Sequence, residues 1–380
     1  MSDNENNEDK IKSLYNESVD ISLPEDILVP NIEEIEDEKI YKNEIEDDVD
    51  VPFKFAFIGA GQGGGRIAQT FKNLGYNRVA AINMAQQDLN TISLENKLCI
   101  GDGGAGKQPE LAKEIFKGKK EDVLDFMRYS FGESFDRIFV CAGGGGGSGS
   151  GMVGPLVETA FELQNSLNGN LKNKVGVILT LPKKSEGSKV LSNAAKALHD
   201  AVNLKNKGII SPLIILDNEK IGNLYPNLSV TKFWDTANSN VAGLFHLFNL
   251  TSNKDSSYSS FDKNDYKTIL DSGTVAFGVS TVKKWDDPVA FSRVVRDNVK
   301  NSLLSGMADI STADRAGVII IASEEILGEL PQNYIDKALD QLNKMLRGGG
   351  VVHRGIYSGD RSTLTIFTAI GGLANPPIMK

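Results

Sequence analysis

The chain of 380 residues is 40% hydrophobic, contains 38 glycines and carries a formal net charge of −9 at pH 7. This composition is typical of a globular protein large enough for two domains, and an acidic balance without a basic stripe argues against direct nucleic-acid binding. No apolar stretch approaches the roughly 18 residues of a membrane span, and the polar start is unlike a signal peptide. Two cysteines near apolar strands and three scattered histidines predict a cytoplasmic protein without a zinc site.

The first 50 residues are strongly acidic. They hold eighteen Asp and Glu against four Lys, so their net charge is −14 and the remainder of the chain carries +5. Such a like-charged block predicts a disordered arm, to which we assign residues 1–52. Spaced apolar residues within it, such as Leu14, Ile21 and Ile27, leave a second interpretation open, in which the arm docks on an adaptor protein or on the chain's own body.

The first glycine-rich turn joins an apolar strand, residues 55–58, to a predicted helix, residues 66–74. Its glycines satisfy the pattern G-x-G-x-x-G, so an NAD-binding oxidoreductase is one alternative. A dinucleotide site also needs an acidic residue at the end of the second strand to hold the ribose. That strand, residues 79–82, ends instead at Asn83, so the motif alone is weak evidence.

A second glycine-rich segment, Gly101 to Lys107, spells G-x-x-x-x-G-K, the first seven positions of a P-loop. The eighth position is Gln108, where a P-loop needs the Ser or Thr that binds magnesium, and Pro109 follows. We therefore expect a loop that offers backbone amides to a terminal phosphate rather than a P-loop.

The third segment, Gly143 to Gly151, is the most informative. It lies between an apolar strand, residues 137–140, and the helical pattern of residues 152–167. Glycines without a Cβ let backbone amides close around a polyanion, and the helix N-terminus adds a partial positive charge. A flexible linker has a similar composition, but linkers are not normally placed between a buried strand and a helix. The segment therefore predicts a phosphate-binding turn.

Farther along, strands and helices alternate from residue 54 to about 226, which predicts a parallel doubly wound sheet. A helical stripe of apolar residues runs from Phe233 to Phe248 and predicts a long buried helix. The remainder predicts a smaller α/β domain, with strands at residues 274–282, 317–322 and 362–370.

Three glycine-rich turns in this order resemble the tubulin/FtsZ superfamily. The run from Gly143 resembles the tubulin signature G-G-G-T-G-[ST]-G, with Ser148 and Ser150 in the hydroxyl positions. The first turn resembles the first phosphate loop of the family, with Gln62 in its tubulin form, and the segment before Pro109 resembles the γ-phosphate loop of FtsZ. Loop style resembles the plasmid- and phage-encoded members of the TubZ type.

The resemblance implies a GTP/GDP site with Mg²⁺, for which the sequence offers no metal-ligand cluster of its own. Asn218 and Asn238 are expected to read guanine, Trp234 or its neighbour Phe233 to stack on the base, and Glu186 to contact the ribose. The full set of nucleotide-binding residues implied is Gly61, Gln62, Gly63, Gly64, Gly65, Arg66, Asn83, Gly104, Ala105, Gly106, Gly144, Gly145, Gly146, Gly147, Ser148, Gly149, Glu186, Asn218, Trp234 and Asn238.

Asp262 and Asp265 resemble the catalytic loop of FtsZ, which acts on the nucleotide of the next subunit, so the resemblance implies a GTPase that polymerises head to tail. Because Asp is also a common helix N-cap, a purely structural interpretation of either residue stays open. The implied domains are a nucleotide-binding domain (53–230), a central helix (231–252), the catalytic loop with the start of the next helix (253–270) and an activation domain (271–375).

We therefore expect a cytomotive filament protein that positions phage or plasmid DNA in a bacterial cell. Two departures from FtsZ bear on this expectation. Val190 stands where FtsZ has an arginine, and the sequence shows no carboxyl-terminal adaptor peptide. An FtsZ-type cell-division GTPase and, more remotely, an NAD-binding oxidoreductase remain the alternatives.

Overall fold

The computed structural model describes residues 50–168, 173–359 and 363–377. The predicted acidic arm, residues 1–52, lies outside the described residues except for its last three. In the described part, no helix is long and apolar enough to cross a membrane.

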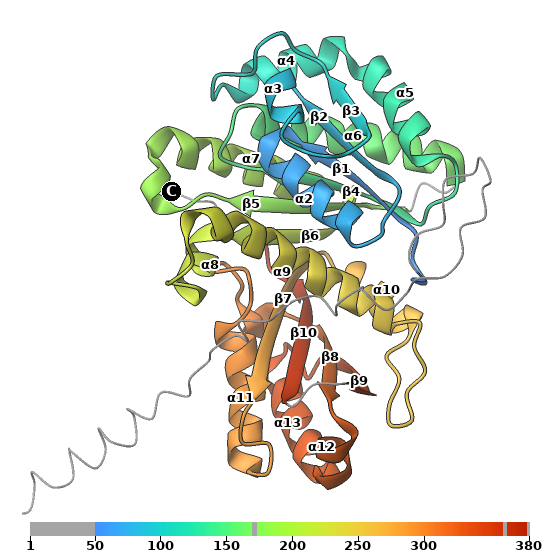
Figure 1. Cartoon of the computed structure of the whole chain (residues 1–380), viewed down its shortest axis with the longest axis vertical. Helices are drawn as coiled ribbons and strands as arrows, with labels where there is room; N and C mark the ends of the chain where they lie inside the picture. The colour runs from blue at the N-terminus through green and yellow to red at the C-terminus, as the bar shows by residue number, and fades with distance from the viewer. Residues whose placement is uncertain (1–49, 169–172, 360–362, 378–380) are drawn as a thin grey trace, which may run out of the picture.

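A single ten-stranded sheet runs through the molecule in the order β3-β2-β1-β4-β5-β6-β7-β10-β8-β9 (Figure 1). From β3 to β7 every pairing is parallel, as predicted for a doubly wound sheet. The strands are β1 (Phe55–Ala60), β2 (Val79–Asn83), β3 (Asn96–Cys99), β4 (Arg137–Gly143), β5 (Val175–Leu181), β6 (Ile210–Asp217), β7 (Thr274–Val282), β8 (Arg315–Ala322), β9 (Val351–Ser358) and β10 (Leu364–Leu373).

Helices cover both faces of the parallel part. They are α2 (Gly61–Asn73), α3 (Gln86–Leu89), α4 (Pro109–Gly118), α5 (Lys120–Phe131), α6 (Ser148–Asn168), α7 (Ser188–Asn206), α8 (Asn218–Leu224), α9 (Val230–Thr251), α10 (Lys263–Leu270), α11 (Pro288–Asn301), α12 (Glu324–Glu329) and α13 (Gln332–Met345), with short 3₁₀ turns η2 (Lys184–Glu186) and η3 (Ile310–Thr312). The predicted helices after the first and third glycine segments begin earlier than expected, because glycines assigned to the turns form the first turns of α2 and α6.

Strand β1 shows why the sheet needs cover on both sides. All six of its residues are buried, and consecutive side chains of a strand point to opposite faces. Phe55 and Phe57 belong to the core that includes α2 and α9, whereas Ala56 and Ile58 belong to the core beneath α4 to α7. Continuous apolar runs of this kind are typical of parallel strands in α/β proteins.

Helix α9 lies against both parts of the sheet, as the apolar stripe predicts (Figure 1). The ring of Phe245 lies 5.0 Å from that of Phe139 on β4 and 6.2 Å from that of Phe277 on β7. Because aromatic rings bury large apolar areas, this cluster holds the parallel part and the later strands together.

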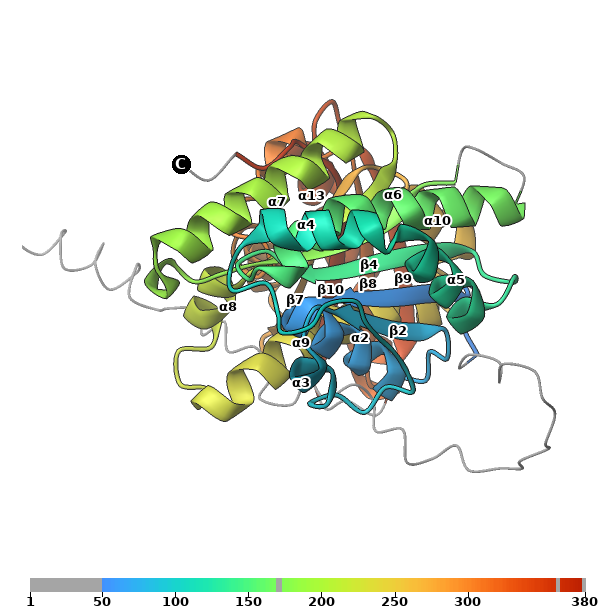
Figure 2. The same cartoon turned by 90° about the horizontal axis from the view of Figure 1, so that it is seen from above.

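The later strands form the mixed part of this sheet. Strand β10 pairs antiparallel with β7 and β8, and β8 pairs parallel with the edge strand β9. The sequence correctly predicts β7, β8 and β10 within a few residues, but β9 was not predicted. Helices α11 and α13 contribute apolar side chains to a third core. Seen from above, α4, α6 and α7 lie on one side of the parallel strands, and α2 and α9 lie on the other (Figure 2). The proposed domain limits stay a prediction, since β6 and β7 pair at Leu213↔Thr274 and Ile214↔Val275 and so join both regions in one sheet.

Candidate functional site

A cavity of about 480 Å³ opens at the carboxyl ends of β1, β4, β5 and β6, the edge at which open parallel sheets bind ligands. Twelve of the predicted nucleotide-binding residues line it, together with several that were not predicted. The lining residues are Ala60, Gln62, Gly63, Arg66, Asp88, Lys107, Gly143, Gly145, Gly146, Gly147, Ser148, Gly149, Thr180, Pro182, Glu186, Val190, Asn218, Trp234 and Asn238. The first and third glycine segments therefore meet at one site.

Two kinds of glycine occur in the segments that meet at this site. A Cβ on Gly61, whose φ is 70°, would stand 2.7 Å from the backbone N of Gly149, so this glycine lets the first turns of α2 and α6 approach each other. A Cβ on Gly64 would collide with the carbonyl oxygen of Cys141 on β4. Gly146 differs from both, because no atom lies within 4 Å of its ideal Cβ. The fold does not need a glycine at Gly146, but a ligand lying against the turn would.

The turn ends at the N-terminus of α6, which has no acidic residue in its first turn. Free backbone amides and the helix dipole make such an end favourable for an anion. Ser148 lines the cavity as predicted. The hydroxyl of Ser150 instead donates to the carbonyl oxygens of Gly146 and Gly147, and Ser150 does not line the cavity, so it stabilises the turn from behind.

The opposite part of the cavity is built from α8 and α9. Asn218 and Asn238 are 4% and 7% exposed and both line it. Trp234 lines it as well and is 37% exposed, whereas Phe233 is buried in the core, with the Lys183 ammonium 3.7 Å from its ring centroid. Of the two aromatic candidates for stacking, the structure thus places Trp234 on the cavity. Asp217 begins α8 by accepting hydrogen bonds from two backbone amides of its first turn.

Glu186 lines the cavity from the turn η2 that follows β5. Its Oε1 accepts a hydrogen bond from the backbone N of Lys183 at 2.7 Å, which fixes one carboxylate oxygen to its own turn. Val190 lies nearby on α7 and also lines the cavity, so at the position where FtsZ has an arginine this chain offers an apolar wall.

Eight of the predicted residues do not line the cavity: Gly61, Gly64, Gly65, Asn83, Gly104, Ala105, Gly106 and Gly144. Asn83 is 1% exposed, and its Oδ1 accepts hydrogen bonds from the backbone N of Met84 at 2.7 Å and of Ala85 at 3.3 Å. Its Nδ2 donates to Oδ2 of Asp88 at 3.2 Å. Because Asp88 itself lines the cavity, Asn83 is connected to the cavity through that carboxylate.

Asp88, Lys107 and Asn193 were missed by the sequence analysis. Asn193 is 1% exposed, and its Nδ2 donates to the carbonyl oxygens of Lys107, Gly145 and Gly146 at 3.1, 3.3 and 3.4 Å. One buried amide thus ties the segment after β3 to the glycine turn after β4. The G-x-x-x-x-G-K pattern was a usable signal for Lys107, but no local pattern marks Asp88 or Asn193.

Asp262 and Asp265 lie away from the cavity, at the start of α10. Oδ1 of Asp262 accepts hydrogen bonds from the backbone N of Asn264 at 2.7 Å and of Asp265 at 2.9 Å. Asp265 returns the capping interaction, since its Oδ2 accepts from the backbone N of Asp262 at 3.1 Å. Its Oδ1 lies 2.6 Å from Nδ1 of His353 on β9. The helix-capping interpretation therefore holds for both residues, and Asp262 remains exposed.

Asp262 and Asp265 lie near the amino end of β1, whereas the cavity lies at its carboxyl end. Lys263, next to Asp262, donates to the carbonyl oxygen of Pro52 at 2.7 Å, just before β1 begins, while the cavity lies where β1 ends. A nucleotide in this chain's cavity is therefore beyond the reach of its own α10 carboxylates.

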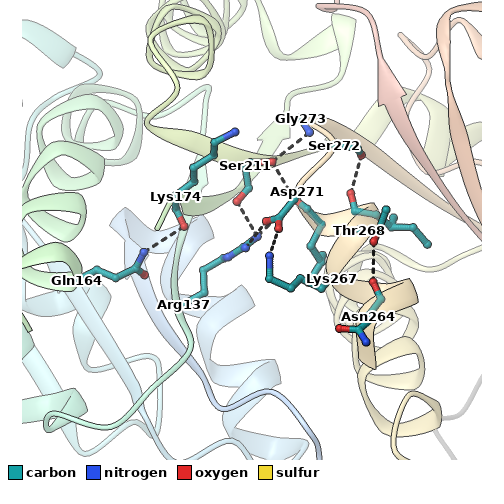
Figure 3. A network of polar contacts seen from close by, with 12 residues as sticks. Arg137, Gln164, Lys174, Ser211, Asn264, Lys267, Thr268, Asp271, Ser272 and Gly273 are labelled. Carbon is teal, nitrogen blue, oxygen red and sulfur yellow. Dashed lines mark hydrogen bonds and ion pairs between the residues drawn. The ribbon is translucent and has the colours of Figure 1, made fainter. Parts of the chain in front are cut away.

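A network of polar contacts joins the carboxyl-terminal end of α10 to the parallel part of the sheet (Figure 3). The guanidinium of Arg137, at the start of β4, lies 2.5 Å from Oδ1 of Asp271 and donates to the carbonyl oxygen of Ser211 at 2.9 Å. Lys267 also pairs with Asp271. Burial would raise the pKa of Asp271, but the charges and hydrogen bonds of Arg137 and Lys267 outweigh it and hold that pKa below its ordinary value.

Comparison with known proteins identifies the fold. Residues 54–226 match the sequence model of the Tubulin/FtsZ family, GTPase domain. This match assigns the GTPase domain of the chain to the tubulin/FtsZ superfamily. The tubulin-like protein TubZ of Bacillus cereus is 26% identical over 249 residues, covering 60% of this chain and 55% of that protein. The cell division protein FtsZ 2 of Haloferax volcanii is 28% identical over 292 residues, covering 74% of this chain and 67% of that protein.

Solved structures show the same fold. A GTPγS-form protofilament of TubZ from Bacillus thuringiensis serovar israelensis has a TM-score of 0.73 at 18% identity, covering 86% of this chain and 89% of that one. A GTPγS-bound protofilament of CetZ2 from Haloferax volcanii has a TM-score of 0.69 at 22% identity, covering 86% and 95%. The match to a GTPase domain argues against the NAD-binding alternative. The match to TubZ of Bacillus cereus covers about 55% of the length of that protein.

Proposed function

We propose that this tubulin/FtsZ superfamily member is a GTP-hydrolysing protein that polymerises head to tail and positions phage or plasmid DNA in a bacterial cell. One observation carries the proposal. The glycine-rich segment Gly143 to Gly151 and the side chains of Asn218 and Asn238 meet at one cavity. Asp262 and Asp265 lie at the other end of the parallel strands. Stacking one subunit on the next would bring these two half-sites together.

The cavity supports binding of a purine nucleotide in a defined direction. Amides at the N-terminus of α6 bind the phosphates, and the open position at Gly146 lets them approach. The carboxamides of Asn218 and Asn238 can each donate and accept hydrogen bonds, as the edge of guanine requires. Trp234 offers a partly exposed ring face to the base.

Magnesium fits this site as an ion held largely by the nucleotide. Within the described ranges no group of three or more His, Cys, Asp or Glu could hold a metal by itself. Mg²⁺ is commonly bound through one or two carboxylates together with substrate phosphates. Asp88, oriented by Asn83, lines the cavity, whereas the other lining carboxylate, Glu186, has one oxygen bound to its own turn. The ion would neutralise phosphate charge there.

Of the two α10 carboxylates, Asp262 suits the reaction with the neighbouring subunit's nucleotide better. Both oxygens of Asp265 are engaged, one by His353 and one by the backbone N of Asp262. Asp262 is exposed and uses Oδ1 for the cap, and its Oδ2 has no hydrogen-bond partner among the residues that the structure describes. That oxygen can therefore orient or deprotonate a water molecule in line with the γ-phosphate.

The test is the dependence of GTP turnover on protein concentration. If catalysis is shared between subunits, turnover per molecule rises with concentration, and ATP fails to replace GTP. Mixing Asp262→Asn with Gly146→Val restores activity, because an intact carboxylate then faces an intact cavity at some junctions. Turnover per molecule that stays constant down to dilute, unpolymerised protein would contradict the shared site.

A cell-division role is the second candidate, favoured by the 292-residue match to the cell division protein FtsZ 2 of Haloferax volcanii. A fluorescent fusion in a bacterial host separates the two roles. Mobile filaments that carry a co-introduced plasmid or phage genome support the cytomotive function, whereas a stable ring at mid-cell supports division.

A further inference from the structure

The cavity holds a lysine that the function proposed above does not require. Lys107 lies on the segment between β3 and α4 and lines the cavity. We propose that the ammonium group of Lys107 binds the terminal phosphate of the nucleotide and makes the site prefer a nucleoside triphosphate to a diphosphate. This inference rests on the proposed nucleotide-binding function and assigns a further residue to it.

Lys107 stands at the phosphate end of the cavity. An ideal Cβ on Gly147 would be 2.9 Å from the backbone N of Lys107, so the two segments touch. In the sheet order, β6, which leads to Asn218, lies on one side of β4, and β3, which leads to Lys107, lies on the other. The lysine is therefore on the side of the glycine turn away from the base, where the last phosphate of an extended nucleotide would lie.

The backbone of Lys107 adopts a conformation that lysine rarely occupies. Its φ is 58°, and no other residue besides glycine in the described ranges has a positive φ. Left-handed backbone is disfavoured for residues with a Cβ, and such outliers persist where the surrounding structure imposes them, often at ligand sites. Glycine would occupy the position without strain. A lysine at a position that glycine would occupy without strain indicates that the lysine side chain has a role there, and its functional group is the ammonium group.

The surrounding structure fixes where this lysine begins. The carbonyl oxygen of Lys107 accepts a hydrogen bond from Nδ2 of Asn193 at 3.1 Å, and the same buried amide also holds Gly145 and Gly146. The stem of Lys107 therefore starts at a set distance from the phosphate turn before any ligand binds. Little ordering remains to be done when a phosphate arrives, which favours binding.

The charge of Lys107 is also available. Two lysines on neighbouring helices are already paired, Lys113 with Asp200 at 3.1 Å and Lys196 with Glu110 at 2.8 Å. Lys107 is exposed, and its side chain makes no hydrogen bond or ion pair with any residue that the structure describes. A flexible ammonium is a compact point charge well suited to a phosphate oxygen. A diphosphate lacks that terminal group and gains less from the contact.

The experiment compares binding of fluorescent GTPγS and fluorescent GDP, with magnesium, to the full-length chain at concentrations below assembly. Lys107→Gly suits the left-handed backbone and removes the side chain together with its charge. We expect it to weaken GTPγS binding by about 10- to 100-fold and GDP binding by less than about threefold. The separate variant Lys107→Arg keeps the positive charge and should retain most of the preference for GTPγS over GDP. Lys117→Gln, which removes a surface charge of α4 away from the cavity, behaves as the wild type.

Two outcomes overturn the inference, and they are distinguishable. If Lys107→Gly keeps the wild-type ratio of the two affinities, whether both stay or both fall equally, then Lys107 does not read the terminal phosphate although the site still binds nucleotide. If the wild-type chain binds neither probe, the proposed function itself fails.

Discussion

At the carboxyl end of β1, the glycine-rich turn before α6 leaves open space beside its backbone, whereas near the amino end of β1 the carboxylates at the start of α10 are mostly engaged by their own helix. Gly146 has no atom within 4 Å of its ideal Cβ, so the turn is open to a ligand. Asp262 and Asp265 instead complete each other's capping interaction, and His353 takes a further oxygen. One end is thus built to receive a ligand, and the other is a rigid element that presents one free carboxylate oxygen.

The largest expected effect comes from the rigid end. Asp262→Asn keeps a residue that caps helices well but removes the charge, so turnover should fall by roughly 10²–10⁴-fold while GTP binding and folding are retained. Filaments of the variant should also persist longer, because the GTP in them is not consumed. Steady-state phosphate release and sedimentation measure both effects.

A matched control for that change is Asp287→Asn. Asp287 caps α11 through the backbone N of Val289 at 2.8 Å and of Ala290 at 3.3 Å, the same role at a site away from α10. Equal loss of turnover in both variants would mean that Asp262 acts only as a cap.

The second effect concerns the open end. Gly146→Val places a branched side chain where the structure has free space, so we expect the fold to survive and nucleotide affinity to fall by at least about 100-fold, since several charge-assisted hydrogen bonds are blocked. Gly118→Val is the control, because Gly118 also has no atom within 4 Å of its Cβ but lies at the end of α4. Wild-type affinity in Gly146→Val would show that the phosphates bind elsewhere.

A smaller effect is expected on the base side of the cavity. Trp234→Ala should weaken GTP binding by about tenfold, the usual size of a lost base–aromatic contact, and leave the fold intact because the ring is 37% exposed. Tyr129→Ala removes a ring that is 81% exposed and lies outside the cavity, and its affinity should not change. A displacement titration distinguishes the two variants, and equal affinities would remove Trp234 from the site.

The smallest effect tests how α10 is held at the rigid end. The folded-state pKa of Asp271 is lowered, so its ion pair with Arg137 stabilises the fold above the unfolded-state value near pH 4. This contribution is lost as the pH falls through the folded-state pKa. We expect Asp271→Asn to lower the free energy of unfolding by about 1–2 kcal/mol at pH 7 and by less near pH 3.

Urea unfolding at the two pH values measures this difference. Asp340→Asn is the control, since its ion pair with Lys344 is exposed and should contribute little at either pH. If Asp271→Asn is equally destabilised at both pH values, the ion pair is not the cause.

The sequence by itself determined the local features of the site. Continuous apolar runs specified the parallel strands, and consecutive glycines between a strand and a helix specified the phosphate turn, because both patterns depend on neighbours in the chain. The predicted starts of α2 and α6 are too late, because a local pattern does not distinguish a glycine in a turn from a glycine in the first turn of a helix. Glycines at the beginning of α2 and α6 look like turn residues in isolation, yet they are glycines because other backbone segments approach them closely. A Cβ on Gly61 would meet Gly149, one on Gly64 would meet Cys141 of β4, and one on Gly151 would meet Pro109.

Only the tertiary structure decided which side chains share a site. Phe233 and Trp234 are adjacent in sequence, but the packing of α9 buries one and leaves the other on the cavity. Asn193 on α7 joins Lys107 to the glycine turn across 86 residues of sequence. The separation of the cavity from Asp262 likewise follows from strand direction and from the position of α10. These relations depend on distances between elements remote in the chain, which no local pattern of residues encodes.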